Sequence, residues 1–155
     1  VPAARLVKIP PEVTDAQAAA SMLKGLTAQY LLRSTYRVKR RDPVVIHAAA
    51  GGVGLLAVQW ARHLGAEVIA IVGSERKAEV AREHGAHHVL LQDQPDLVAR
   101  VRGVTKGRGV PVVYDSVGRD TFTASLDCLR PRGLMVTFGN ASGPVPPFAP
   151  LELSK

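Results

Sequence analysis

Short runs of apolar, mostly β-branched residues alternate along the chain with segments whose apolar residues recur every three or four positions. Five such runs occur, at residues 44–48, 68–72, 88–91, 110–114 and 134–138. Strands that are apolar on both faces are typical of a parallel sheet covered by helices on both sides. The pattern therefore predicts an α/β fold, with a doubly wound parallel sheet of five strands.

The segments between these runs predict helices with recognisable ends. Between the first two runs, an apolar stripe at helical spacing predicts a helix that ends at Gly65. Further helices are expected over residues 74–84, where Ser74 is a candidate N-cap, and over residues 96–102 and 120–129.

Residues 1–43 form a helical lead-in to the first strand. Thr14 and Gln17 have the spacing of a capping box, which predicts that a helix begins here. We expect Gly25 to interrupt this helix, and a second helix to follow over residues 26–36.

The length of 155 residues fits one domain. Residues 44–140 would form its βα units, and residues 141–155 an irregular tail, since prolines and glycines crowd residues 143–147. The chain opens at Val1 without a targeting signal, and we expect it to be part of a longer, two-domain protein.

Composition narrows the possible partners. Twenty basic against thirteen acidic residues give a net charge of +7, which favours phosphorylated ligands or nucleic acid. Only 5% of residues are aromatic, which argues against a platform on which the bases of a single strand would stack.

The most apolar stretch, residues 44–61, is interrupted by His47, glycines and Gln59 and is therefore not expected to span a membrane. One cysteine, Cys128, excludes an internal disulfide and favours a reducing, cytoplasmic setting; we expect it to be buried and inert.

The segment after the first strand is rich in glycine and reads Ala-Ala-Ala-Gly-Gly-Val-Gly at residues 48–54. Gly51 would let backbone N–H groups approach a pyrophosphate at the start of the next helix, and Gly54 would let that helix pack tightly on the strand. This context predicts a Rossmann domain that binds a dinucleotide. Two alternatives stay open: glycines that serve packing alone, and a methyltransferase that binds another adenosine ligand.

The end of the second strand normally determines which ribose is accepted, because an acidic residue there bonds the 2′-hydroxyl of NAD. Gly73 and Ser74 occupy that position, and Arg76 and Lys77 follow where a 2′-phosphate would need cations. NADPH is therefore expected over NADH, although Arg76 and Lys77 could equally form a solvated helix face. Glu75 is an acidic residue beside this position and counts against a 2′-phosphate there, although in the first turn of a helix its side chain could point away.

The remaining strand ends carry weaker signals. Residues 115–118 and 139–140 are small or polar and could meet a ribose or nicotinamide, while Asp115 could equally cap the next helix. The five histidines lack metal-ligand spacing and are expected to be structural or superficial.

Four segments taken together, residues 18–28, 47–54, 113–118 and 138–140, resemble the NADPH:quinone oxidoreductases. These form the zeta-crystallin-like branch of the medium-chain dehydrogenase/reductase superfamily. The resemblance implies hydride transfer from NADPH to a quinone or an activated enone. It also implies no catalytic zinc, because residues 21–24 offer no cysteine where zinc alcohol dehydrogenases carry a ligand.

Motif and resemblance together define the candidate cofactor-binding residues, with no metal ligand and no catalytic residue among them. Gln92 departs from the tyrosine of the family's bacterial members, which weakens the NADP assignment without removing it. The candidates are Thr27, Ala50, Gly51, Gly52, Val53, Gly54, Gly73, Ser74, Lys77, Gln92, Ser116, Val117, Phe138, Gly139 and Asn140.

The resemblance further implies a substrate-binding barrel domain supplied by residues before Val1 and after Lys155. A sixth edge strand would pair across a homodimer, and the chain alone is expected to be inactive. Two alternatives remain: an enoyl reductase of the same superfamily, and a nucleotide-sensing or RNA-binding module.

Overall fold

The computed structural model describes residues 1–154 and has a five-stranded parallel sheet as its centre. The strand order is β3-β2-β1-β4-β5. The predicted fold class, a Rossmann-like doubly wound sheet with five strands, is confirmed. The strands are β1 (Pro43–Ile46), β2 (Glu67–Val72), β3 (His88–Leu91), β4 (Val110–Asp115) and β5 (Leu129–Thr137).

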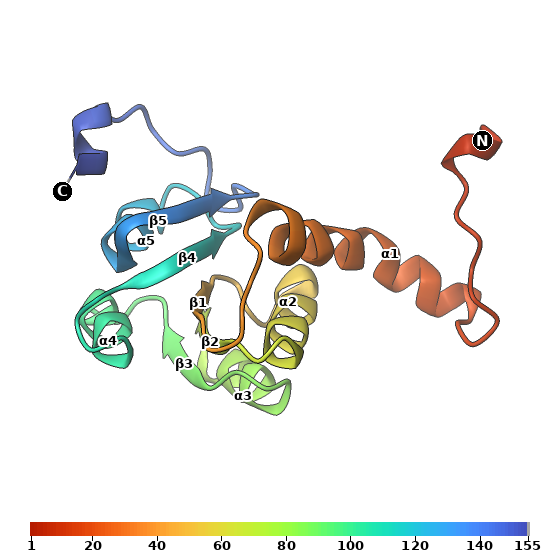
Figure 1. Ribbon diagram of the computed structural model, residues 1–155, viewed down its shortest axis with the longest axis horizontal. Coiled ribbons are helices and arrows are strands. Elements are labelled where there is room, and N and C mark those ends of the chain that lie inside the picture. The colour runs from red at the N-terminus through yellow and green to blue at the C-terminus, as the bar shows by residue number, and fades with distance from the viewer. Residues whose placement is uncertain (155) are drawn as a thin grey trace.

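Helices cover both faces of the sheet (Figure 1). One core contains residues of α2 and α3 with Val44, Ile46 and Tyr114; the other contains residues of α4 and α5 with Val45 and Val113. Alternate residues of each central strand thus enter opposite cores, as burial on both faces requires. The helices are α1 (Asp15–Tyr30), α2 (Gly52–His63), α3 (Glu75–Glu83), α4 (Leu97–Val104) and α5 (Phe122–Cys128).

The lead-in differs from expectation in one respect. Thr14 and Gln17 form the predicted capping box, but α1 runs without a break through Gly25, so the expected interruption is wrong. A methyl group placed on Gly25 would have open space around it, and Gly25 has no left-handed backbone conformation to break the helix. A π-helical turn over Leu31–Thr35 follows α1 directly.

The C-terminal part also differs from the predicted boundaries. β5 begins at Leu129, five residues before the expected start, and continues past Pro131 with a register irregularity opposite Val110 and Val112. Proline is tolerated here because β5 lies at the edge of the sheet. The tail is irregular over residues 143–147 as expected, but a 3-10 turn forms at Pro150–Ser154; Lys155 lies outside the described residues.

All five strands run in the same direction, so their carboxyl ends meet at one edge of the sheet. The chain leaves β1 toward β2 on one side, while β4 pairs with β1 on the other. This reversal of strand order is where ligands of open α/β sheets bind. In the part of the chain that the structure describes, no helix is both long and apolar enough to cross a bilayer.

Candidate functional site

The glycine-rich turn after β1 leaves several backbone donors unused. Ala48 has a positive φ of 47°, and the N–H of Gly51 donates to its carbonyl oxygen at 2.8 Å, which closes the turn. The N–H groups of Gly52, Val53 and Gly54 begin α2 and donate to no acceptor in the described residues. Gly52 is exposed, so the turn offers free donors at the positive end of the helix dipole.

The glycines of the turn have separate steric roles. A methyl group on Gly54 would lie against the Ala48 carbonyl oxygen and only 2.8 Å from Cα of Ala49, so Gly54 packs the helix on the turn as predicted. A methyl group on Gly51 would lie 3.0 Å from the Ala48 carbonyl oxygen, a closer contact than side chains normally make. The absence of a side chain at Gly51 therefore lets the turn close, and it also leaves the backbone of the turn accessible to a ligand.

The end of β2 is open, as the NADPH assignment requires. Gly73 is exposed, and a methyl group there would meet nothing within 4 Å. Ser74 is the N-cap of α3, where its hydroxyl accepts the N–H of Lys77 at 3.4 Å. The side chain of Lys77 is exposed, and Gln92 is held beside Gly73 because its N–H donates to the Val72 carbonyl oxygen.

The loops after β4 and β5 pack on each other. A methyl group on Gly139 would lie 2.9 Å from the Ser116 carbonyl oxygen, so the two loops approach as closely as glycine allows. The Phe138 N–H donates to the Asp115 carbonyl oxygen, and Val117 is buried. Asn140 is exposed at the end of β5, where its side chain remains accessible.

Asp115 is fully buried, and both oxygens of its carboxylate accept hydrogen bonds from residues of the loop and helix that follow it. Oδ1 accepts the N–H groups of Val117 and Gly118 at 2.7 and 3.0 Å, while Oδ2 accepts the hydroxyls of Thr121 and Ser125 at 2.7 and 2.8 Å. Burial raises the pKa of Asp115, but a charge interaction with His47 and these hydrogen bonds outweigh burial and hold the pKa below its ordinary value. Thr121 is the N-cap of α5, so Asp115 orders the loop before that helix rather than capping it.

His47 joins this network from the end of β1. Its Nε2 lies 3.0 Å from the hydroxyl oxygen of Ser125, which donates to Asp115, so Nε2 carries the proton and donates. Burial lowers the pKa of His47, against a smaller opposing effect of Asp115, and its Nδ1 has no partner in the described residues. The sequence places His47 within the first apolar run and Asp115 directly after the fourth, but it gives no sign that Ser125 connects them.

Lys24 of α1 lies at the turn, and Thr27 follows it one helical turn later. Thr27 is half-buried, and its hydroxyl donates to the Leu23 carbonyl oxygen at 2.8 Å. Lys24, which sequence reasoning missed, lays its side chain across Gly52: a methyl group there would lie 2.8 Å from Cε and 3.4 Å from Nζ of Lys24. The only sequence signal was the spacing of Lys24 and Thr27, three residues apart on one helix face.

A cavity of about 650 Å³ lies elsewhere. It is lined mainly by apolar side chains of the N-terminal segment, α1 and α2, among them Val7, Met22, Leu26 and Trp60. None of the residues that line it belongs to the glycine turn at residues 48–54. The described residues contain no cluster of three metal-binding side chains, and burial raises the pKa of the Cys128 thiol to about 12, as its expected inertness requires.

Comparison with known proteins gives a consistent picture. Residues 52–154 match the family model described as zinc-binding dehydrogenase. The sequence is 58% identical over 137 residues to a quinone oxidoreductase of Salmonella typhimurium, which covers 88% of this chain and 42% of that protein. It is 52% identical over 153 residues to a 2-haloacrylate reductase of Burkholderia, with 97% and 46% covered.

The fold matches equally well. The structure of Escherichia coli quinone oxidoreductase complexed with NADPH superposes with a TM-score of 0.92 at 52% identity, and the match covers 96% of this chain and 45% of that one. The resemblance to quinone oxidoreductases stated from the sequence is thereby confirmed. The chain spans less than half the length of these relatives.

Proposed function

Since the chain belongs to the zinc-binding dehydrogenase family, we propose that it is the NADPH-binding module of a quinone oxidoreductase. The observation that carries the proposal is the set of free N–H donors at the start of α2, beside the exposed Gly51 and Gly52. These donors suit a pyrophosphate, and one relative of the same fold was solved in complex with NADPH. The open space at Gly73 and the exposed Lys77 support NADPH over NADH.

In this proposal the chain binds and orients while the dinucleotide supplies a hydride. The turn at residues 51–54 would hold the pyrophosphate, and Gly73, Ser74, Lys77 and Gln92 would surround the 2′-phosphate. The closely packed loops after β4 and β5 would support the nicotinamide end, together with Thr27. No side chain has to act as a general acid, since a reduced quinone oxygen takes its proton from water.

The acceptor is a small electrophile. Quinone oxidoreductase relatives favour a quinone, while the 2-haloacrylate reductase favours an activated carbon–carbon double bond as a second candidate. Reaction with either acceptor would also require residues of a substrate-binding domain that hold the acceptor against the nicotinamide ring. Such positioning can lower a reaction barrier by roughly 7–11 kcal/mol. We therefore propose that turnover requires the rest of a longer protein.

Three further features complete the proposal. No catalytic zinc is proposed, because residues 21–24 offer no cysteine or histidine as a ligand. The outer edge of β5 is unpaired in the described sheet, where a sixth strand of the longer protein would pair with it, and a homodimer formed through that sixth strand is proposed. A cytoplasmic setting agrees with a single, unpaired cysteine.

Nucleotide titration tests the proposal directly. We expect NADPH to bind and to raise the melting temperature more than NADH does, with roughly 2.7 kcal/mol of added stability at 100 times the dissociation constant. Oxidation of NADPH with a soluble quinone or a haloacrylate should be no faster than without the chain. Equal or tighter binding of NADH would overturn the NADPH assignment.

A further inference from the structure

The ammonium of Lys24 lies at a place where a positive charge is unfavourable without an anion. Its side chain crosses Gly52, the first residue of α2, and Nζ would be 3.4 Å from a methyl group on that glycine. The amino end of a helix carries a partial positive charge, and α2 has no acidic residue in its first turn. Helix dipole and ammonium therefore repel each other at this point.

Nothing in the described part of the chain compensates this repulsion. Lys24 takes part in neither of the two ion pairs among the described residues, His88 with Glu67 and Arg119 with Asp120, and it makes no hydrogen bond to another of these residues. The N–H groups of Gly52 and Val53 next to it are also free. Backbone N–H groups and an ammonium thus meet at the positive end of a helix dipole, with no acceptor among residues 1–154.

We propose that Lys24 is a binding residue for the pyrophosphate of the dinucleotide. The proposal rests on the proposed function and deepens it. The ammonium donates to a phosphate oxygen that the amides of α2 also bind, so the anion converts a repulsive arrangement into an attractive one. The pyrophosphate is common to NADPH and NADH, so Lys24 contributes to binding both, whereas Lys77 contributes only where a 2′-phosphate is present.

This arrangement also gives Gly52 a specific role. Cε and Cδ of Lys24 lie 2.8 and 2.9 Å from where a methyl group on Gly52 would be, so any side chain there displaces the lysine stem. The backbone itself has no such conflict, because the atoms that a methyl group would meet all belong to the far end of one flexible side chain. The absence of a side chain at Gly52 thus leaves the space in which the Lys24 side chain lies.

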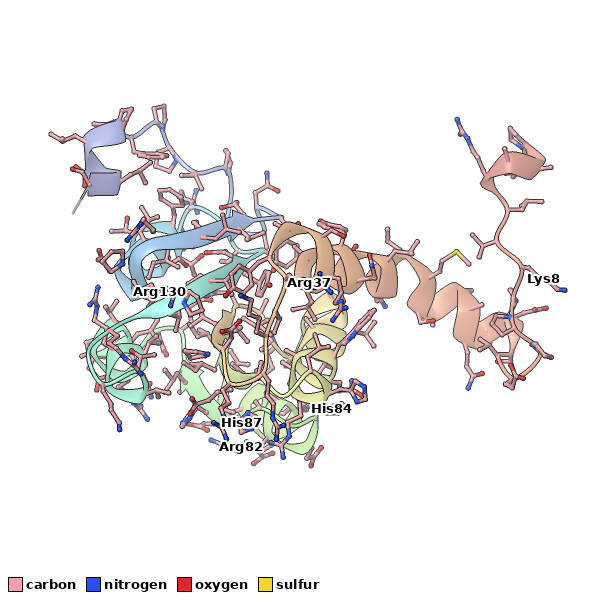
Figure 2. The ribbon with its side chains drawn as sticks, viewed as in Figure 1. Lys8, Arg37, Arg82, His84, His87 and Arg130 are labelled. Carbon is pink, nitrogen blue, oxygen red and sulfur yellow. The ribbon has the colours of Figure 1, made fainter. Side chains whose placement is uncertain are left out.

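The test compares Lys24→Met with Lys24→Arg, Lys77→Met and the control Lys8→Met. Lys8 is an exposed lysine on the N-terminal segment, away from the sheet (Figure 2). We expect Lys24→Met to weaken NADPH and NADH binding by the same factor, about tenfold, and Lys24→Arg to restore most of it. Lys77→Met should weaken NADPH alone, and Lys8→Met neither. Unchanged affinities in a folded Lys24→Met variant, or a loss confined to NADPH, would overturn the proposal.

Inorganic pyrophosphate separates this inference from the proposed function. If neither nucleotide binds, but pyrophosphate binds to the unaltered chain more tightly than to Lys24→Met, the proposed function fails and the anion site stands. If Lys24→Met leaves pyrophosphate affinity unchanged as well, the inference fails.

A double-mutant cycle tests the pairing of Lys24 with Gly52. Gly52→Ala should leave the melting temperature nearly unchanged and weaken NADPH binding. The doubly substituted chain should bind no more weakly than Lys24→Met alone, because both changes remove the same contact. Fully additive losses would show that Gly52 acts independently of Lys24 and would contradict this part of the proposal.

Discussion

The turn after β1 and the loop after β4 begin side by side, at the ends of two paired parallel strands, but they use their backbone donors in opposite ways. In the loop after β4, the N–H groups of Val117 and Gly118 both donate to the buried Asp115 carboxylate. In the turn after β1, the N–H groups of Gly52 and Val53 donate to nothing in the described chain. The backbone donors of the loop after β4 are therefore satisfied within the chain, whereas those of the turn after β1 are free to bind a ligand.

The difference separates scaffold from site. A loop whose donors are satisfied by its own carboxylate keeps its shape without a ligand, whereas free donors on an exposed turn gain most from an external anion. His47 and Ser125 connect the two regions, since Ser125 bonds both His47 and Asp115. The rigid loop therefore helps fix the start of the open turn.

Gly54→Ala should have the largest effect, because it attacks the packing under the open turn. The added methyl group would collide with backbone atoms of Ala48 and Ala49, which cannot move independently of β1. We expect a loss of about 3 kcal/mol in unfolding free energy, measured by urea denaturation. The matched control is Gly103→Ala, a helical glycine with open space, which should be neutral or stabilising. Equal stability of the two variants would contradict this packing role.

Gly51→Val should abolish nucleotide binding in a chain that still folds. The side chain would occupy the approach to the free amides and press on the Ala48 carbonyl oxygen, 3.0 Å from Cβ. We expect at least about 100-fold weaker NADPH binding by calorimetry, equivalent to roughly 2.7 kcal/mol. Circular dichroism monitors folding, with Gly103→Val as the control. Unchanged affinity would mean that the glycines serve packing alone.

Much of this comparison could be predicted from the sequence, and the omissions have physical causes. The five strands and the open turn follow from apolar runs and local glycine spacing. The interruption at Gly25 was a wrong inference because glycine costs a helix only about 1 kcal/mol, which packing of α1 on α2 offsets. The early start of β5 was hidden by Pro131 and Gly133, which oppose strand formation by propensity but are accommodated at a sheet edge.

The candidate site divides in the same way. Residues 51–54 and 73–77 could be predicted as candidates because their signals are local, whereas Lys24 and Ser125 make their contacts across the fold. Lys24 meets Gly52 only because α1 packs on α2, and Ser125 meets His47 across 78 residues of sequence. No local pattern reports such contacts.

Gly73→Asp should change the preference between NADPH and NADH without altering the free N–H donors of the turn after β1. Open space around Gly73 accommodates the carboxylate, which would bond a 2′-hydroxyl and repel a 2′-phosphate. We expect the affinity ratio of NADPH to NADH to fall by about tenfold or more, equivalent to roughly 1.4 kcal/mol, in parallel fluorescence titrations. Gly73→Ala is the control and should change the ratio little. An unaltered ratio in Gly73→Asp would place the ribose elsewhere.

His47→Gln should have the smallest effect, visible as a change in pH dependence. Burial lowers the pKa of His47 below 6.5, so the unfolded chain takes up a proton that the folded chain refuses, and stability falls as the pH drops below 6.5. The slope approaches about 1.4 kcal/mol per pH unit for one proton. The side-chain amide of the variant would retain a donor for Ser125 without titrating. Urea denaturation at pH 7.5 and 5.5 should therefore show a smaller loss in the variant; identical losses would exclude a buried, neutral His47.

Amide hydrogen exchange, followed residue by residue by nuclear magnetic resonance, tests the contrast between the open turn and the satisfied loop most directly. Without nucleotide, the amides of Gly52 and Val53 should exchange rapidly, while those of Val117 and Gly118 exchange slowly. Saturating NADPH should slow exchange at Gly52 and Val53 by tenfold or more and leave Val117 and Gly118 slow. Rapid exchange at Gly52 and Val53 that persists in saturating NADPH would contradict the account, since the open turn would then not be where the nucleotide binds.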